Sequence, residues 1–253
     1  MLEIDNSRFF FKTKEIWFSE VPYDITGYDG VTFHGCLKDV KVKGFSKEKF
    51  TTLVIDLTQD LDIIWKKIDG QSCRYSINKA IKLGVKVRLN QDYDTFNKIN
   101  SEFRKLKGLT DYDIDVEFMK KNGLLFLSEF EGKIIGVYLA ITDGKTIRGW
   151  IGASIRLEEG TNNQLSGNSN RLIIWEIIKY AKERGMDTFD MGGYYTGEKP
   201  DPQKERINFF KKSFGGELVT QYIYQKDYSK TYSFAKWVYS TYNRLKSGNL
   251  KAS

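Results

Sequence analysis

The central part of the chain, from Val85 to Gln225, changes its hydrophobic period in a regular order. Apolar residues in short runs or at alternate positions predict strands at 85–90, 124–130, 133–141, 146–154, 188–191 and 217–225. Apolar residues three and four positions apart predict helices near 96–106, 114–121, 170–184 and 204–214. The resulting order, β-α-α-β-β-β-α-β-α-β, indicates a mixed α/β domain with an antiparallel centre and one helical crossover.

The clearest of these elements is the helix that follows residue 169. Its apolar side consists of Ile174, Ile177, Ile178 and Ala181. We expect Asn170 to be its N-cap and Gly185 to end it in a left-handed conformation. The segment 155–169 before it is expected to be a loop.

The first part of the chain is rich in β-type sequence, with runs at 9–18, 31–42 and 51–57 separated by turn-forming glycines. A helix should follow at 61–68. A second helix after Gly70 should bury Ile77, Ala80 and Ile81 and end at Gly84. On its other side Arg74, Asn78 and Lys82 fall at i, i+4 and i+8, which suits either a solvated surface or a ligand-binding face.

The length of 253 residues is ample for a buried core, and the net charge is +7. The charge is uneven, because residues from Lys226 onward carry +5 and residues 1–225 only +2. A basic groove for nucleic acid is therefore not required by composition, and the tail is the better candidate for contact with a polyanion.

The 2 cysteines, Cys36 and Cys73, form neither a metal-type pair nor a disulfide framework, and there is 1 histidine, His34. We therefore expect no metal site and a protein of the reducing cytoplasm. No secretory signal or membrane-spanning run is expected in the given sequence.

After Asp227 the sequence predicts a basic amphipathic helix. Its apolar side is formed by Phe234, Trp237, Val238, Thr241 and Leu245. Such a helix can lie on an anionic membrane surface or can dock on the protein body, and the sequence leaves both open.

Three stretches resemble the Fem-type aminoacyltransferases, which have a GNAT-like fold. They are CRYSINKAIKLGVKV (73–87), LIIWEIIKYAKERGMDTFDMGG (172–193) and INFFKKSFGG (207–216). The resemblance covers about 52–225 and implies transfer of an amino acid from aminoacyl-tRNA to a peptidoglycan precursor. It predicts a reduced N-terminal half (1–84), a complete GNAT-like domain (85–227) and the tail helix (228–253).

The resemblance is incomplete, because the bridge-forming enzymes resemble two GNAT units in tandem and here only one is complete. Coenzyme A-dependent members of the fold cradle pyrophosphate in a Q/R-x-x-G-x-G/A loop before the crossover helix. The nearest match is the segment 164–169, with Gln164 and Gly167, which lacks the final small residue and follows Glu158 and Glu159.

Lys211 and Asp190 are the candidate catalytic residues. Lys211 borders the apolar side of its helix, and the resemblance implies that the F-K-x-x-F motif of Phe210, Lys211 and Phe214 holds the lysine that acts at the acyl group. An exposed, snorkelling lysine is the alternative. Asp190 either orients the acceptor amine or accepts backbone N–H groups in an Asx turn.

The remaining candidates surround these two residues. Gly192 and Gly193 permit close approach of a ligand, or a tight turn, and Tyr194 follows them. Gly149 and Gly152 permit a bulge beside Trp150, which forms either the floor of an acceptor pocket or part of the core. The residues expected to bind donor or acceptor are Trp150, Asn170, Gly192, Gly193, Tyr194, Phe210 and Arg74.

Three hypotheses follow. The first is a Fem-like N-acyltransferase that uses aminoacyl-tRNA, acts on a cell-envelope glycan or peptide precursor and works in the cytoplasm or at the inner face of the plasma membrane. The second is an acyl-CoA-dependent N-acyltransferase of an amino sugar in surface-polysaccharide synthesis. The third is an inactive GNAT-like module that binds glycan or lipid. No tightly bound cofactor is expected in any of them. All rest on one geometric expectation, that the strands starting at Thr146 and Thr188 diverge and that the Lys211 ammonium points between them.

Overall fold

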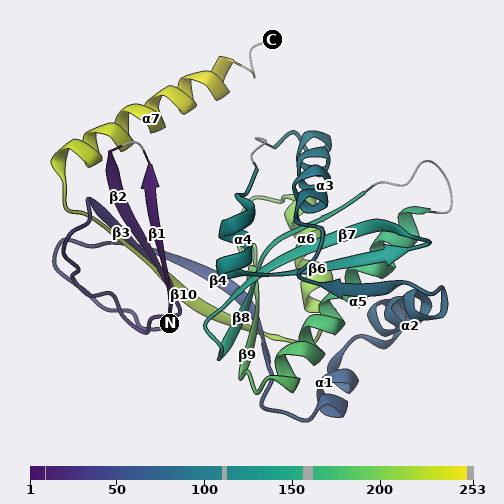
Figure 1. The fold of residues 1–253 in the computed structure, drawn as a ribbon. Coiled ribbons are helices and arrows are strands. Elements are labelled where there is room, and N and C mark those ends of the chain that lie inside the picture. Colours follow the sequence, from purple (N-terminus) through teal and green to yellow (C-terminus); the bar gives the residue numbers. More distant parts are fainter. Residues whose placement is uncertain (9, 110–112, 156–161, 250–253) are drawn as a thin grey trace. The chain divides into compact units, whose positions relative to one another are not determined.

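A computed structural model describes residues 1–8, 10–109, 113–155 and 162–249. The backbone groups into two compact units (Figure 1). One comprises Met1–Phe50 and Thr220–Ser253, and the larger one comprises Thr51–Val219. Among the described residues, no helix is both long enough and apolar enough to cross a lipid bilayer.

The larger unit contains a mixed sheet with the strand order β4-β9-β8-β7-β6-β5. These strands are β4 (Ser46–Asp56, of which the unit contains the part from Thr51), β5 (Lys86–Leu89), β6 (Gly123–Phe130), β7 (Lys133–Thr142), β8 (Thr146–Ser154) and β9 (Thr188–Gly193). All neighbours pair antiparallel except β8 and β9, which are parallel. That parallel pair requires a crossover, and the long helix α5 (Asn162–Glu183) supplies it.

Helices cover both faces of this sheet. Successive residues of a strand point to opposite faces, and here both sets include apolar side chains that are buried under helices. The other helices of the unit are α1 (Leu61–Lys67), the π-helical turn η1 (Gly70–Arg74), α2 (Tyr75–Lys82), α3 (Tyr93–Leu106), α4 (Val116–Asn122) and α6 (Pro202–Lys212). Phe126 of β6 packs in a core with α1, α2 and α5, whereas its neighbours Leu125 and Leu127 pack in a second core with α3 and α4.

The predicted order of elements from Val85 to Gln225, and the fold class with it, is confirmed. Gly185 ends α5 as expected, with a φ of 68° that a residue with a side chain rarely adopts. Asn170 is not the N-cap, because the helix begins at Asn162 and Asn170 lies inside it. Ile81 was expected inside but is 53% exposed, since it lies near the end of its helix.

The smaller unit is built on a sheet with the order β1-β2-β3-β10. Its elements are β1 (Leu2–Arg8), β2 (Phe11–Trp17), β3 (Gly30–Cys36), β10 (Glu217–Asp227, of which the unit contains the part from Thr220) and α7 (Lys230–Asn249). β2 and β3 are parallel and the other pairs are antiparallel. Ile16, Phe33 and Tyr224 form its buried core.

These units differ from the predicted segments 1–84, 85–227 and 228–253. Residues 51–84 belong to the larger unit, because β4 pairs with β9 and Ile64 and Ile77 are part of its core. The end of β10 and the helix α7 group with the first fifty residues, because β10 pairs with β3. Long-range pairing of this kind is not visible in local sequence patterns.

Candidate active site

The strands β8 and β9 pair over only three residues and then separate. Their parallel register runs from Thr146 opposite Thr188 to Arg148 opposite Asp190, although β8 continues to Ser154 and β9 to Gly193. We call the region beyond Arg148 and Asp190 the strand split. The pairing of these two strands ends there, as expected, although the Gly149 carbonyl oxygen still lies 3.3 Å from where a β-carbon on Gly192 would be.

On the β8 side of the split, the strand carries a bulge. Ala140 of β7 pairs with Gly149 and Leu139 pairs with Ile151, so that Trp150 is an extra residue between them. Trp150 is 38% exposed, and its ring lies 5.6 Å from that of Phe118 in α4. It is therefore not the buried core tryptophan that the sequence also allowed.

On the β9 side, the chain turns at Gly192 and Gly193. The N–H of Gly192 donates a hydrogen bond of 2.7 Å to Oδ1 of Asp190, which is the Asx-turn arrangement considered from the sequence. Gly192 has a φ of 81°. Tyr194 then returns to β4, where its N–H donates to the Thr51 carbonyl over 2.7 Å, and its half-buried ring packs on the core.

The Lys211 side chain reaches this turn from α6. Its Nζ donates a hydrogen bond of 2.6 Å to the Gly193 carbonyl and lies 3.6 Å from where a β-carbon on Gly192 would be. Phe210 and Phe214 hold this part of α6 on the core, with ring centroids 5.5 Å apart. Lys211 is half-buried rather than extended into solvent.

Burial lowers the pKa of Lys211 from 10.5 to about 8. Removing water from an ammonium disfavours its charged form, and this effect outweighs the opposing attraction of Asp190, while Arg148 adds a smaller lowering effect. A lysine in this state can act as a hydrogen-bond donor or, when neutral, as a base close to physiological pH.

Asp190 is 2% exposed and is held by several donors. The Arg148 guanidinium forms an ion pair with Oδ2, and the Thr52 hydroxyl and the Gly192 N–H donate to Oδ1. A carboxylate bound in this way fixes the turn at Gly192 rather than projecting freely toward a substrate.

The other predicted residues lie at different distances from the split. Asn170, in α5, donates from Nδ2 to the Ser154 hydroxyl at the end of β8 over 3.3 Å. Arg74 lies at the end of η1 with its guanidinium over Gly70, and no hydrogen bond or ion pair among the described residues joins it to Lys211. The segment 164–169, the nearest match to a pyrophosphate loop, lies inside α5; Glu158 and Glu159 lie outside the described residues.

Three residues at the split were not selected from the sequence: Arg148, Thr52 and Tyr138. The signal for Tyr138 was the pair Gly149 and Gly152 in one strand, since glycine inside a strand often marks close approach of another group. Arg148 and Thr52 gave no local signal, because their role depends on facing Asp190 across two different strand pairs.

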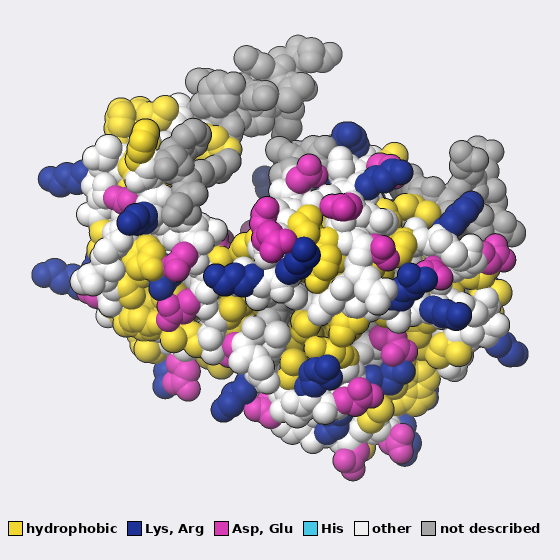
Figure 2. Space-filling view, viewed as in Figure 1, with side chains coloured by type: hydrophobic (Ala, Val, Ile, Leu, Met, Phe, Trp, Pro, Cys, Tyr) yellow, Lys and Arg dark blue, Asp and Glu magenta, His cyan; other side chains and the backbone are white. Residues whose placement is uncertain are grey.

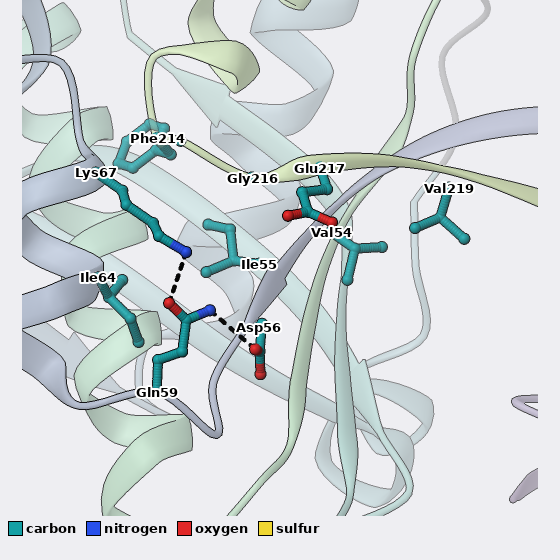
Figure 3. A pocket seen from close by; sticks show the side chains of 11 residues that line it. Val54, Ile55, Asp56, Gln59, Ile64, Lys67, Phe214, Gly216, Glu217 and Val219 are labelled. Atoms are coloured by element: carbon teal, nitrogen blue, oxygen red, sulfur yellow. Dashed lines mark hydrogen bonds between the residues drawn. The ribbon is translucent and has the colours of Figure 1, made fainter.

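A separate cavity of about 120 Å³ lies near the other end of β4 (Figure 3). It is lined by Val54, Ile55, Asp56, Gln59, Ile64, Lys67, Phe214, Gly215, Gly216, Glu217 and Val219. Lys67 donates to Gln59 over 2.6 Å, and Gln59 donates to Asp56 over 2.8 Å. Lys211, Gly192 and Gly193 are not among the residues that line it.

The sequence profile of the acetyltransferase (GNAT) domain matches residues 71–201. The lipid II:glycine glycyltransferases of two strains of Staphylococcus epidermidis are 26% identical over 200 residues, which is 77% of this chain and 45% of theirs. The chain thus spans less than half the length of these curated relatives.

Among solved structures, FemX superposes with a TM-score of 0.60 at 16% identity, covering 78% of this chain and 72% of that chain. The C-terminal domain of a lysylphosphatidylglycerol synthetase from Agrobacterium fabrum gives a TM-score of 0.54 at 12% identity, covering 78% and 68%. These likenesses show the fold, and together with the sequence match they confirm the resemblance to Fem-type proteins. The strand order, the split after Arg148 and the profile match agree, and the chain belongs to the acetyltransferase (GNAT) domain family.

Proposed function

We propose that this chain is a Fem-like N-acyltransferase that moves an aminoacyl group from aminoacyl-tRNA to an amino group of a cell-envelope precursor. The observation that carries the proposal is the half-buried Lys211 ammonium at the strand split, 2.6 Å from the Gly193 carbonyl. A split between two parallel strands exposes backbone groups in the middle of a sheet, where an acyl group can lie between the strands.

The reaction is an acyl transfer between oxygen and nitrogen. The acceptor amine forms a C–N bond at the acyl carbon, the C–O ester bond to the ribose breaks, and the proton lost by the amine leaves with the departing oxygen. Negative charge gathers on the acyl oxygen in between. Lys211 stabilises this charge, and a donor of this kind contributes most where water is excluded.

We assign Asp190 a positioning role in place of the direct contact with the amine first considered. Its carboxylate accepts from Gly192 and pairs with Arg148, and it thereby holds the turn on which Lys211 rests. Trp150, exposed on the bulge, forms one wall for the acceptor or the donor.

The donor is the part of the proposal that needs a direct test. Aminoacyl-tRNA is supported by the similarity to the glycyltransferases, whose names give glycine as the transferred group and lipid II as the acceptor. Acyl-CoA is supported by the acetyltransferase description of the family. The helical conformation of 164–169 favours the first, because it leaves no pyrophosphate loop in that segment.

We propose further that α7 brings the protein to the surface of an anionic membrane. The helix contacts its own unit through Tyr232, whose ring lies 5.3 Å from that of Phe11, and through Ser233 and Lys236, which hydrogen-bond to Asp227. Two neighbouring aromatic side chains on another side of the helix face away: Phe234 and Trp237 are 63% and 62% exposed. Figure 2 shows hydrophobic side chains gathered over the first half of this helix.

The helix therefore docks through Tyr232 and polar contacts and leaves Phe234 and Trp237 exposed, whereas a helix that docks through its apolar side would bury them. Tryptophan and tyrosine suit the boundary between water and lipid, and basic residues near them favour anionic headgroups. The segment from Lys226 onward carries the +5 charge that such a surface attracts. A precursor linked to lipid would then be presented near the protein.

The experiment that tests the main proposal offers the purified protein two labelled donors, an aminoacyl-tRNA and an acyl-CoA, with an amine acceptor. Discharge of the aminoacyl-tRNA supports the proposal, and discharge of acyl-CoA alone replaces it with the amino-sugar acyltransferase. If neither donor is discharged or bound, the inactive binding module is the better description. Lys211→Ala should abolish transfer without unfolding the protein. Lys212 is the exposed neighbour of Lys211, and Lys212→Ala should retain transfer.

A further inference from the structure

Tyr138 of β7 occupies space that two glycines of β8 leave open. A β-carbon on Gly149 would lie 1.9 Å from the Tyr138 hydroxyl oxygen, and one on Gly152 would lie 2.9 Å from Cδ2 of its ring. Neither distance is compatible with a side chain. The two glycines therefore seat the Tyr138 ring flat against β8 in addition to allowing the bulge at Trp150.

The Tyr138 hydroxyl lies at the strand split. It rests beside Gly149, and Gly149 is the first residue of β8 after Arg148, the last one paired with β9. A β-carbon on Gly192 would lie 3.3 Å from the Gly149 carbonyl oxygen and 3.6 Å from the Lys211 Nζ. Gly149 thus has the Tyr138 hydroxyl at its Cα, while its carbonyl faces the turn that holds Lys211.

The hydroxyl is available as a donor. Among the described residues it makes no hydrogen bond, although the ring packs on the same core as Phe210 and Tyr194. Burial raises the pKa of Tyr138, and the nearby charge of Asp190 raises it further against the opposing effect of Arg148. The phenol therefore stays protonated at any working pH.

We propose that Tyr138 is a second catalytic residue, which donates a hydrogen bond to the acyl oxygen from the β8 side of the split while Lys211 donates from the β9 side. This inference rests on the proposed acyl transfer. When the amine attacks, the carbonyl electron pair moves onto oxygen, and both donors hold that oxygen without giving up their protons. Two donors on opposite walls fix the direction of the carbonyl, which a single flexible ammonium does not.

The test uses Tyr138→Phe, which keeps the ring that Gly149 and Gly152 accommodate. We expect kcat to fall about 10²- to 10³-fold, as for removal of one oxyanion donor, with little change in the KM of either substrate. Tyr180→Phe is the matched control, because Tyr180 is also half-buried, packs edge-on against Phe126 at 5.5 Å and belongs to α5. Its kcat should equal that of the wild type.

A series of acyl donors with different leaving groups distinguishes hydrogen-bond donation to the acyl oxygen from protonation of the leaving group. A donor to the acyl oxygen is needed whatever group departs, so the loss in Tyr138→Phe should be the same for a ribose ester, a thioester and an activated cyanomethyl ester of one amino acid. If the loss disappears with the activated ester, Tyr138 protonates the leaving group and the proposal is overturned. It is also overturned if Tyr138→Phe transfers at the wild-type rate while Lys211→Ala does not transfer. Absence of transfer by the wild type itself would refute the proposed function, and the inference with it.

Discussion

Arg148 and Asp190 are the last pair in the parallel register of β8 and β9, and their side chains form an ion pair at that point. No residue beyond it is paired between the two strands. The ion pair is mostly removed from solvent, with side chains 12% and 2% exposed. It therefore marks the place where the sheet opens and holds the two strands together up to that place.

Loss of one partner of this pair should destabilise the fold. Arg148→Met leaves the buried Asp190 carboxylate without its guanidinium, and we expect the free energy of unfolding to fall by about 3–5 kcal/mol in urea denaturation. Lys204→Met is the control, because Lys204 pairs with Asp201 at 3.1 Å with side chains 56% and 32% exposed. That change should cost no more than about 1 kcal/mol. Equal losses in the two variants would contradict the structural role of the Arg148–Asp190 pair.

The pKa of Lys211 predicts how stability depends on pH. The folded chain releases this proton near pH 8, whereas the unfolded chain keeps it until about 10.5. Between these values the unfolded state binds more protons, so the free energy of unfolding should rise with pH. Lys211→Met should remove this rise. The measurement is denaturation of the wild type and of Lys211→Met at roughly pH 7.5, 9 and 10.5, which span the range between the folded and unfolded pKa values.

The same pKa predicts the pH dependence of transfer. If the ammonium form stabilises the acyl oxygen, kcat should fall as pH rises through about 8. An alkoxyamine acceptor should be used, because its nitrogen stays neutral over this range and does not titrate. A rate that increases through pH 8 would show instead that neutral Lys211 acts as a base. Lys212→Met should retain the wild-type profile.

The two adjacent glycines at the end of β9 should differ in their tolerance of a methyl group. Gly192 has a φ of 81°, and a β-carbon there approaches both the Gly149 carbonyl and the Lys211 Nζ. Gly193 has nothing within 4 Å of that position and no positive φ. Gly192→Ala should therefore cost about 1–2 kcal/mol and most of the transfer activity, while Gly193→Ala should be close to wild type in thermal unfolding and in the transfer assay. The reverse order would show that the turn is not constrained as described.

Membrane contact through α7 predicts a specific loss of liposome binding. Replacing Phe234 and Trp237 with serine removes two exposed aromatic side chains without touching Tyr232, Ser233 or Lys236, so the helix should stay in place. Co-sedimentation with vesicles containing phosphatidylglycerol should decrease strongly, and raised salt should weaken the wild type as well. Tyr75→Ser, at a position 60% exposed in α2, is the control and should not change binding. Unchanged sedimentation of the double variant would end the membrane proposal.

Local patterns along the chain predicted most of the elements correctly. Alternating runs such as those at 124–130 and 133–141 became β6 and β7, and the helical spacing of Ile174, Ile177 and Ile178 became the buried side of α5. The errors fell at helix ends: α5 starts eight residues before Asn170, since the polar segment 162–169 also winds as helix against Ile155 and α2. Polar residues at a helix start carry a weak signal, because the same residues suit a loop.

Local sequence patterns predicted only part of the candidate site. Lys211, Asp190, Gly192 and Gly193 stand close together in sequence or in recognisable motifs, and the structure joins them. Arg148, Thr52 and Tyr138 come from other strands, and nothing in their immediate neighbours marks them. Arg74 was selected from the sequence as a residue that binds donor or acceptor, because it belongs to a helical pattern. Its guanidinium lies over Gly70, and this position does not support that role.

The order of strands and helices, the apolar faces that they bury and the lysine at the end of α6 could be read from the chain alone, because these features depend on spacing over a few residues. Three features of the site required the three-dimensional arrangement: the pairing of β8 and β9 ends after Arg148, the Lys211 ammonium binds the Gly193 carbonyl, and Tyr138 lies over Gly149. Strand register and side-chain direction are set by packing between segments far apart in the chain, and that packing is a property of the whole fold.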